Sequence, residues 1–289
     1  MNGWLVVNGY LKSSKFNELY NCFLNSAKQL NISLQLVPTD RLVVLNGADF
    51  PFPRPDFVLF WDKDVALARR MERAGFRLFN SSSAIEVCDN KILTALALQG
   101  TVDMPQTLFS PKTFPGVGYT NLDFVAKAAD VMGLPLIIKE AYGSFGEQVY
   151  LANTVDEAKD IVRRLAGKDF LIQQFIAESR GRDVRLNVVG GKVVNAIMRT
   201  SNTDFRSNIT LGGAKSAYQP TAQEVHLAEK VCASIGLDFA GVDVLFGTNG
   251  PLLCEVNSNP HFKSTYDCTG VDLSKNILLH IVKTLTTNA

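Results

Sequence analysis

Two apolar stretches near the C-terminus, residues 241–246 and 251–257, have the pattern of paired β-strands. The residues Thr-Asn-Gly at 248–250 suit a three-residue hairpin loop whose glycine takes the left-handed conformation. A loop of that length places Asp243 opposite Glu255. Because side chains alternate along a strand, one face of this hairpin is predicted to carry polar residues and the other to be wholly apolar.

The face that carries the two carboxylates is predicted to hold Asp243, Leu245, Leu253, Glu255 and Asn257, and the opposite face Val242, Val244, Cys254 and Val256. Magnesium binds one or two carboxylates and completes its shell with water and phosphate oxygens. The pattern therefore favours a magnesium site that handles nucleotide phosphates. A buried polar cluster and a solvated strand face are the alternatives, although unpaired buried carboxylates are costly without a cation.

Charge and cysteine content argue against several classes of protein. The 289 residues include 29 basic and 28 acidic side chains, so the net charge of +1 does not indicate a nucleic-acid or membrane partner. Five scattered cysteines lack the close spacing of a zinc site, and an odd number without a disulfide framework favours a reducing cytoplasm. We see no signal-peptide pattern and no apolar run long enough to cross a membrane. A cytoplasmic protein is expected.

The first third of the chain alternates strands and helices. Strands are predicted at 4–7, 32–37, 57–61 and 77–79, and helices at 16–30 and 65–74. This order implies parallel strand pairing with right-handed crossovers. We expect a small open α/β domain over residues 1–88.

Two further modules are predicted, over residues 89–176 and 177–289. The first begins with a helix at 89–99, capped by Asp89 and ended by Gly100. It continues with helices at 121–132 and 155–166, the second capped by Thr154, and with strands at 134–140, 147–152 and 170–175. The second contains a hairpin at 184–199, a polar loop at 203–216, a helix at 221–235, the 241–257 hairpin, a loop, and a helix at 271–284.

A glycine loop at residues 143–146 follows a strand that ends in Lys139. A glycine loop between antiparallel strands can lay its backbone N–H groups on phosphates, and a lysine offers them a point charge. A flexible hairpin with a surface lysine is the alternative. Lys91, in the first turn of its helix, has the pattern of an ordinary solvated lysine when taken alone. The loop is neither a P-loop nor a dinucleotide fingerprint.

Arginines gather around the start of the third module. Arg182, Asp183 and Arg185 precede Arg199, and residues 204–208 read Asp-Phe-Arg-Ser-Asn. Guanidinium groups suit phosphate or carboxylate ligands, whereas simple solvation is the alternative for a charged loop.

Taken in order, these features resemble the ATP-grasp superfamily. The order is Lys91, Lys139, the glycine loop, Gln173–Ile176, Asp183, Arg206 and Asn208, Asp243, then Glu255 and Asn257. Within the superfamily the chain resembles the RimK-type α-L-glutamate ligases and their lysine-biosynthesis relatives, from about residue 88 to 289. The most specific matches are 181–185, 204–208, 212–214, 240–243 and 254–257. The implied fold is α/β (α+β), an ATP-grasp fold with an N-terminal open α/β pre-grasp domain.

The resemblance implies a role for each matching residue. ATP phosphates would contact Lys91 and Lys139 beneath a flap made of Gly143, Ser144, Phe145 and Gly146. Adenine would lie on the hinge strand Gln173, Gln174, Phe175 and Ile176, with the ribose at Asp183. Arg206 and Asn208 would stabilise the transferring phosphoryl group. Asp243, Glu255 and Asn257 would hold two Mg²⁺ ions, or Mn²⁺ in their place.

The reaction implied by the resemblance joins a carboxylate to an amine. ATP phosphorylates the carboxylate, and the amine then attacks the acyl phosphate to form an amide. The expected substrates are an amino acid, with glutamate first, and an acceptor carboxylate on a peptide, protein tail or metabolite. Arg199, Lys215 and His261 are the candidate substrate contacts. Relatives often form dimers or tetramers, so a homo-oligomer is an open expectation.

Two departures from the family pattern leave specificity open. Gln174 stands where relatives usually have an acidic residue, although an amide can still accept a hydrogen bond from adenine. His261 and Phe262 stand where many glutamate-adding relatives have small residues. A phosphotransferase that forms no amide and a non-catalytic nucleotide-binding protein are the rival functions. ADP release without amine dependence would identify the first, and ATP binding without turnover the second.

Overall fold

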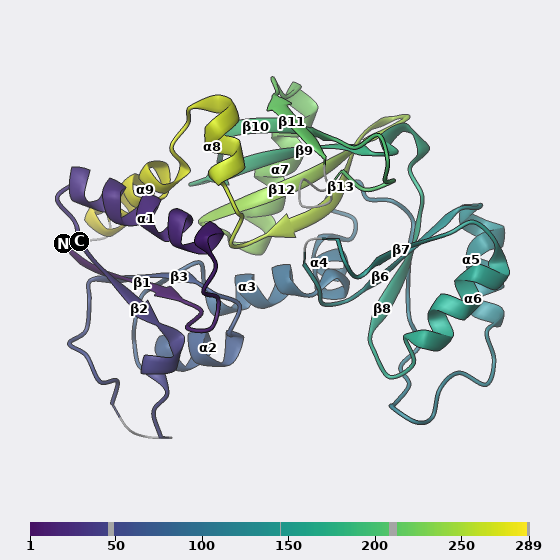
Figure 1. The fold of residues 1–289 in the computed structure, drawn as a ribbon, viewed down its shortest axis with the longest axis horizontal. Coiled ribbons are helices and arrows are strands. Elements are labelled where there is room, and N and C mark those ends of the chain that lie inside the picture. Colours follow the sequence, from purple (N-terminus) through teal and green to yellow (C-terminus); the bar gives the residue numbers. More distant parts are fainter. Residues whose placement is uncertain (46–48, 145, 208–212, 288–289) are drawn as a thin grey trace.

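The computed structural model describes residues 1–45, 49–144, 146–207 and 213–287. Its first sheet has four parallel strands in the order β2-β1-β3-β4. Figure 1 labels the first three of them, β1, β2 and β3. Its elements are β1 (Asn2–Val7), α1 (Ser14–Gln29), β2 (Ser33–Pro38), a 3-10 turn (Thr39–Leu42), β3 (Phe57–Trp61), α2 (Val65–Arg73) and β4 (Leu78–Phe79). All five residues of β3 are buried, as expected for a central parallel strand. The predicted parallel α/β lobe is confirmed.

Two short helices connect this lobe to the rest of the chain. They are α3 (Ser82–Asp89) and α4 (Lys91–Leu98), where a single helix at 89–99 was expected. Asp89 is the last residue of α3 and pairs with Lys63 at 2.5 Å. The cap of α4 is Asn90, whose side chain accepts hydrogen bonds from two backbone N–H groups of the first turn. The predicted cap was wrong because Asp89 is already helical.

The central sheet is antiparallel, in the order β5-β8-β6-β7. Its elements are β5 (Thr107–Phe109), α5 (Asp123–Met132), β6 (Leu136–Glu140), β7 (Val149–Ala152), α6 (Val155–Arg164) and β8 (Phe170–Gln174). Thr154 caps α6 as predicted, accepting a hydrogen bond from the backbone N–H of Glu157. The helices and the sheet enclose a core of their own that includes Val125, Ile138 and Phe170.

The third sheet is also antiparallel, in the order β11-β10-β9-β12-β13. Its elements are a 3-10 turn (Ala177–Ser179), β9 (Arg182–Val189), β10 (Lys192–Thr200), β11 (Ala214–Ala217), α7 (Ala222–Ile235), β12 (Phe239–Gly247), β13 (Gly250–Asn257), α8 (Lys263–Thr269) and α9 (Leu273–Thr287). Strand β11 overlaps the end of the predicted polar loop at 203–216 and extends one residue past it, and α8 lies inside the loop expected after the hairpin. Both are short and poor in strong β- or helix-forming residues, so pairing and packing with β10 determine them.

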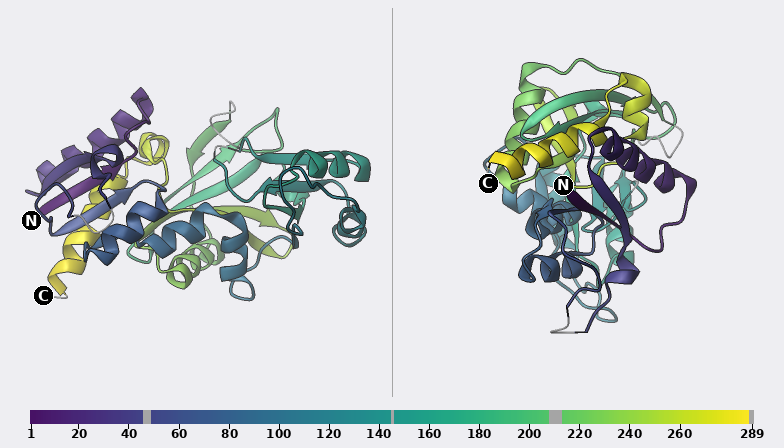
Figure 2. Two further views of the ribbon diagram at one scale, coloured as in Figure 1. Left: turned by 90° about the horizontal axis from the view of Figure 1, so that it is seen from below. Right: turned by 90° about the vertical axis from the view of Figure 1, so that its left-hand side faces the viewer.

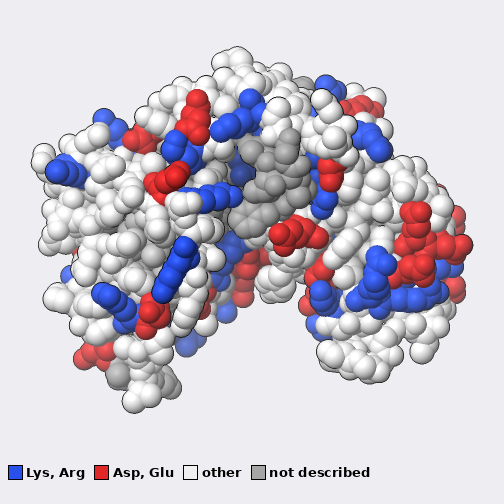
Figure 3. Space-filling view, viewed as in Figure 1, with Lys and Arg blue, Asp and Glu red and all other residues white. Residues whose placement is uncertain are grey.

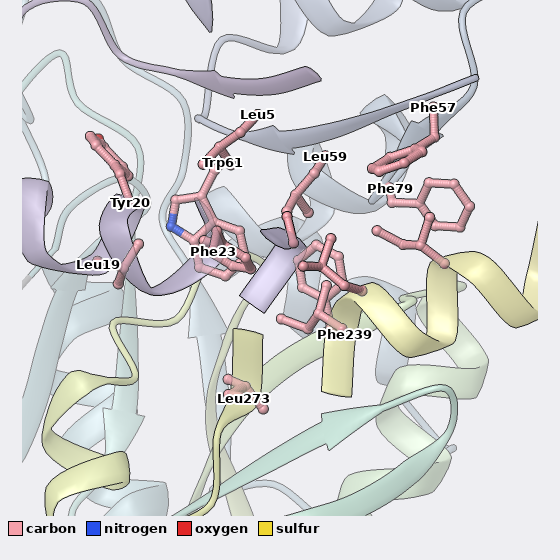
Figure 4. Packing of buried hydrophobic residues seen from close by; sticks show 14 of the residues in the cluster. Leu5, Leu19, Tyr20, Phe23, Phe57, Leu59, Trp61, Phe79, Phe239 and Leu273 are labelled. Carbon is pink, nitrogen blue, oxygen red and sulfur yellow. The ribbon is translucent and has the colours of Figure 1, made fainter. Parts of the chain in front are cut away.

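One hydrophobic core joins the first and last parts of the chain. Phe23 and Trp61 pack against Phe239 and Phe262, and Trp61 stacks on Phe239 with ring centroids 5.4 Å apart (Figure 4). The amide of Asn80 adds four hydrogen bonds across the same junction.

Helix α9 packs on α1, and both chain ends lie on one side of the molecule (Figure 2). Because the first and last segments share a core, the domain boundaries at 88 and 176 stay predictions. No helix in the described ranges is long and apolar enough to span a membrane.

Candidate active site

The hairpin of β12 and β13 makes the predicted carboxylate pair through a different turn. Asp243 lies opposite Glu255. Gly247 pairs directly with Gly250, so two residues form the turn instead of three. That turn alone would place Asp243 opposite Cys254. A β-bulge just after Asp243 shifts the register by one residue and restores the pair.

The bulge also changes which side chains face the cleft beside the hairpin. Cys254 and Glu255 together oppose Asp243, and all three line the cleft. Leu253 is 2% exposed and packs into the core beneath the sheet with Val242. The predicted faces of Cys254 and Leu253 were wrong, because strict alternation fails at a bulge. Burial raises the pKa of the Cys254 thiol to about 11.

This cleft lies between the central sheet and the third sheet, where the space-filling view is hollowed (Figure 3). Its volume is about 870 Å³ when the open mouth is included. The cleft gathers most of the residues predicted for the nucleotide and its ions. These are Lys91, Lys139, Gly143, Ser144, Gly146, Gln173, Gln174, Phe175, Ile176, Asp183, Arg206, Asp243 and Glu255. Phe145 and Asn208 lie outside the described residues.

Two neighbouring lysines line the cleft, since the backbone N–H of Lys91 donates to the carbonyl of Ala141, just after the strand that carries Lys139. Lys139, at the end of β6, is 8% exposed, and its Nζ lies 4.0 Å from the sulfur of Cys254. Among the described residues Lys139 makes no ion pair. Lys91 donates from Nζ to the carbonyl of Gly143 at 3.2 Å and lies 3.5 Å from Glu255. A cation held in a buried wall without a carboxylate partner suits a phosphate ligand.

The glycine loop is held from the other side by Arg206. Its guanidinium pairs with Asp204 at 2.8 and 2.9 Å and donates to the carbonyl of Gly146. The hydrogen bond and charge of Asp204 raise the pKa of Arg206, and those of Arg206 lower the pKa of Asp204. Arg206 therefore lies against the flap, and its predicted contact with the transferring phosphoryl group stays a prediction.

The predicted hinge strand has its polar groups partly engaged. Gln173 donates from its side-chain amide to the hydroxyl of Thr107 at 3.0 Å. The backbone N–H of Gln174 donates to the carbonyl of Gln106 at 2.9 Å. Both glutamines and the two residues after them line the cleft, where the adenine contact is a prediction.

A chain of buried ion pairs crosses three strands of the third sheet. Arg185 on β9 binds both oxygens of Asp243 on β12, at 2.6 and 2.7 Å. Arg199 on β10 binds both oxygens of Asp183 at 2.7 and 2.5 Å. Arg199 also lies 2.9 Å from Oδ2 of Asp243, which joins the two pairs.

Charge neutralisation governs the titration of this network. Burial would raise the pKa of Asp243, but Arg185 and Arg199 outweigh it and lower that pKa. Burial would likewise lower the pKa of Arg199, and the two carboxylates raise it instead. Sequence reasoning missed the role of Arg185, and it gave Asp183 and Arg199 ligand roles. In the structure Asp183 and Arg199 bind each other, so their contacts with a ribose or a substrate stay predictions.

The donor types at the hairpin fit a magnesium ion. Asp243, Glu255 and Asn257 offer carboxylate and amide oxygens, the hard donors that magnesium prefers. The Glu255 side chain is 31% exposed, and its nearest cation, Lys91, is 3.5 Å away. The Nδ2 atom of Asn257 is buried without a partner among the described residues. Since Asp243 carries three arginine contacts, Glu255 is the carboxylate best placed to bind a cation.

A second pocket continues from the first, between the N-terminal lobe and the third sheet. Its walls include Phe16, Trp61, Asp62, Arg185, Asn257 and His261. His261 packs against Phe16, and burial lowers its pKa to about 4, so the ring is neutral at pH 7. Lys215 lines neither pocket and lies 3.4 Å from Asp267, so its predicted substrate contact is not supported by its position.

Three sheets around a cleft with lysines, a glycine flap and an acidic hairpin define the ATP-grasp fold. The D-alanine–D-alanine ligase of Bacillus anthracis in complex with ATP superposes with a TM-score of 0.75 at 15% identity, over 100% of this chain and 98% of that one. A RimK domain ATP-grasp protein of Sphaerobacter thermophilus DSM 20745 gives 0.74 at 19% identity, over 97% and 99%. At these identities the likeness shows the fold, which confirms the predicted class.

Sequence comparison identifies the family. The model of the RimK-like ATP-grasp domain matches residues 89–281, so the chain belongs to that family. An uncharacterized MG012 homologue of Mycoplasma pneumoniae is 34% identical over 253 residues, 86% of this chain and 87% of that protein. A probable alpha-L-glutamate ligase of Parasynechococcus marenigrum is 36% identical over 243 residues, 83% of this chain but 50% of that protein. The expectation of an ATP-dependent ligase is confirmed at the level of the family.

Proposed function

We propose that the protein joins an amino acid, with glutamate as the first candidate, to the carboxylate of an acceptor at the expense of ATP. The observation that carries this proposal is the continuity of the two pockets. Ser144, Gly146, Arg199 and Glu255 line both of them. A nucleotide in the first pocket and substrates in the second would therefore meet at the flap and at Glu255.

The first pocket supplies positioning and charge for phosphoryl transfer. Lys139 and Lys91 each bring an ammonium group to the cleft, and that of Lys91 lies beside Glu255. Glu255 and Asn257, with Asp243, would hold magnesium, which when bound neutralises phosphate charge. Phosphoryl transfer needs such positioning more than covalent help from the protein. The flap, bound by Lys91 and Arg206 through its carbonyl groups, would exclude water from the transferred group.

The second pocket suits substrates that carry carboxylates. Arg185 keeps its Nη1 group without a hydrogen-bond partner among the described residues, while Nε and Nη2 bind Asp243. Guanidinium groups are strong carboxylate ligands. Glutamate is proposed as the amino acid because several relatives are named probable alpha-L-glutamate ligases. The acceptor class is a peptide, a protein tail or a small carboxylate.

ADP release tests this function. The protein is incubated with ATP and magnesium across the amino acids, with and without carboxylate acceptors, and products are weighed by mass spectrometry. Coupled ADP release and a mass gain of whole amino-acid residues are expected. Glu255→Gln should abolish both, whereas Glu229→Gln, which removes a surface partner of Lys192, should change neither. ADP without an amide would instead indicate a phosphotransferase, and ATP binding without ADP a binding protein.

A further inference from the structure

The N-terminal sheet has a topological switch point that opens into the second pocket. In the order β2-β1-β3-β4 the chain leaves β1 to one side for β2 and returns to its other side for β3. In open parallel sheets, ligands bind outside the carboxyl ends of the strands where the order reverses. Here the first residues past those ends are Asn8 after β1 and Asp62 after β3. They meet, because Nδ2 of Asn8 lies 3.3 and 3.4 Å from the two carboxylate oxygens of Asp62.

The segment around Asp62 reaches the reacting end of the nucleotide cleft. Asp62 lines the second pocket together with Glu255. Its neighbour Lys63 lies 3.4 Å from the hydroxyl of Ser144 in the flap. The backbone carbonyl of Asp62 accepts a hydrogen bond of 2.8 Å from Asn259, two residues past the acidic hairpin's Asn257. These contacts place Asp62 on the wall of the second pocket, next to Lys63, whose side chain reaches the flap where the two pockets join.

One carboxylate of the second pocket is available to bind the ammonium group of a substrate. Among the described residues that line it, the carboxylates are Asp62 and Glu255. Glu255 lies at the cation site of the hairpin, so Asp62 remains. An amino acid enters as an ammonium ion and must lose a proton before its nitrogen can attack. Burial raises the pKa of Asp62, against hydrogen bonds from the Lys63 N–H and Asn8, and a higher pKa makes a better proton acceptor.

We propose that Asp62 binds the ammonium group of the incoming amino acid and accepts its first proton. This role rests on the proposed ligase function. The neutral nitrogen then forms a bond to the carbonyl carbon of the acyl phosphate, and the bond from that carbon to the phosphate oxygen breaks. Phosphate leaves with the electron pair and takes the second proton of the nitrogen. Asp62 returns the first proton to solvent. The buried aromatic side chains of Tyr20 and Trp61 line the same pocket.

A binding comparison separates this role from a structural one. The probes are the amino acid selected by the ADP screen, L-glutamate in our proposal, and the same compound without its amino group, glutarate. Titrations use a non-hydrolysable ATP analogue and magnesium. The wild type should bind glutamate at least tenfold more tightly than glutarate, because charge-assisted hydrogen bonds are strong. Asp62→Asn should abolish that preference, and Asp62→Glu should restore part of it.

The matched control is Asp64→Asn. Asp64 caps α2 through the N–H of Leu67, and asparagine caps helices equally well. The charge of Asp64 also raises the pKa of Asp62, so this variant removes one negative charge beside the pocket, as Asp62→Asn does, but retains the Asp62 carboxylate, and it should keep the wild-type preference. An unchanged preference in Asp62→Asn, or an equal loss of both ligands, would overturn the role of Asp62.

Hydroxylamine provides a test of the proton step. It is largely neutral at pH 7 and traps an acyl phosphate as a hydroxamate without needing a base. Asp62→Asn should form hydroxamate within about twofold of the wild type but lose at least a hundredfold in amide formation, as expected for a missing general base. Equal losses in both reactions would refute the proton-accepting role. If wild-type protein forms neither product with any acceptor, the ligase function itself fails.

Discussion

Removal of Arg199 should destabilise the protein through the buried network rather than through lost substrate contacts. Arg199 is 5% exposed and binds Asp183 and Asp243. Arg199→Met keeps the apolar stem but leaves Asp183 without its guanidinium partner. Breaking a buried pair by removing one partner costs about 3–5 kcal/mol. An unfolding entropy of about 2.1 cal/mol/K per residue gives about 0.6 kcal/mol/K for 289 residues, so Tm should fall by about 7 °C.

Thermal unfolding followed by circular dichroism measures this effect, and pH tests its cause. The folded-state pKa of Asp243 is lowered, because Arg185 and Arg199 outweigh the effect of burial. The stabilisation is therefore present above the ordinary carboxyl pKa of about 3.9 and lost as pH falls through the lower folded value. The difference in Tm between the wild type and Arg199→Met should be largest near pH 7 and should become smaller below pH 4.

The control lies on the same strand as Arg199. The Lys192 side chain is 78% exposed and pairs with Glu229 at the surface. Lys192→Met removes this pair and should cost at most about 1 kcal/mol of stability. A Tm loss below about 2 °C in Arg199→Met, or a loss as large at pH 3 as at pH 7, would refute the argument.

Three further outcomes concern the cleft. Glu255→Gln should abolish ADP release while the circular dichroism spectrum stays unchanged, and continued turnover would remove Glu255 from the cation site. Lys139→Ala should raise the KM for ATP about tenfold or more, since it deletes a buried positive charge; an unaltered ATP titration would contradict this. Cys254 should resist iodoacetamide in the native protein at pH 8, because burial raises its thiol pKa to about 11. Cys254 and Cys268 are both partly exposed, so peptide mapping that finds them equally reactive would contradict this prediction.

The sequence predicted the fold class and most of the cleft, because these depend on local patterns. Strand β3 was predicted with its observed bounds, and Lys139 and the hinge strand lie in the cleft as expected. The Asp243–Glu255 pair was predicted correctly but from an incorrect turn. The turn has two residues instead of three, and a bulge after Asp243 compensates for the one-residue difference in register. A second bulge in the β9–β10 hairpin brings Asp183 opposite Arg199. A bulge of one extra residue does not alter the alternation of apolar and polar residues enough to be recognised in the sequence.

Other parts of the site depend on contacts between distant segments. Arg185 binds Asp243 only because β9 and β12 are neighbours, although 58 residues separate them. Lys63 lies close to Ser144 although 81 residues separate them in the sequence and they belong to different lobes. Charged side chains like these give the same sequence pattern as solvated surface residues. Their roles emerge only when the three sheets are assembled.

The division of the hydrophobic cores makes the cleft between the central and third sheets a boundary between two separately packed bodies. One wall belongs to the central sheet, which encloses its own core, and the other to the third sheet, which shares a core with the N-terminal lobe through Phe239. Two chain segments, around 99–106 and 175–181, connect these bodies. A rotation of the central sheet about these segments would break the hydrogen bonds of Lys91 and Arg206 to the glycine loop but would leave both cores intact. A ligand that contacts both walls would therefore restrain the movement of one body relative to the other.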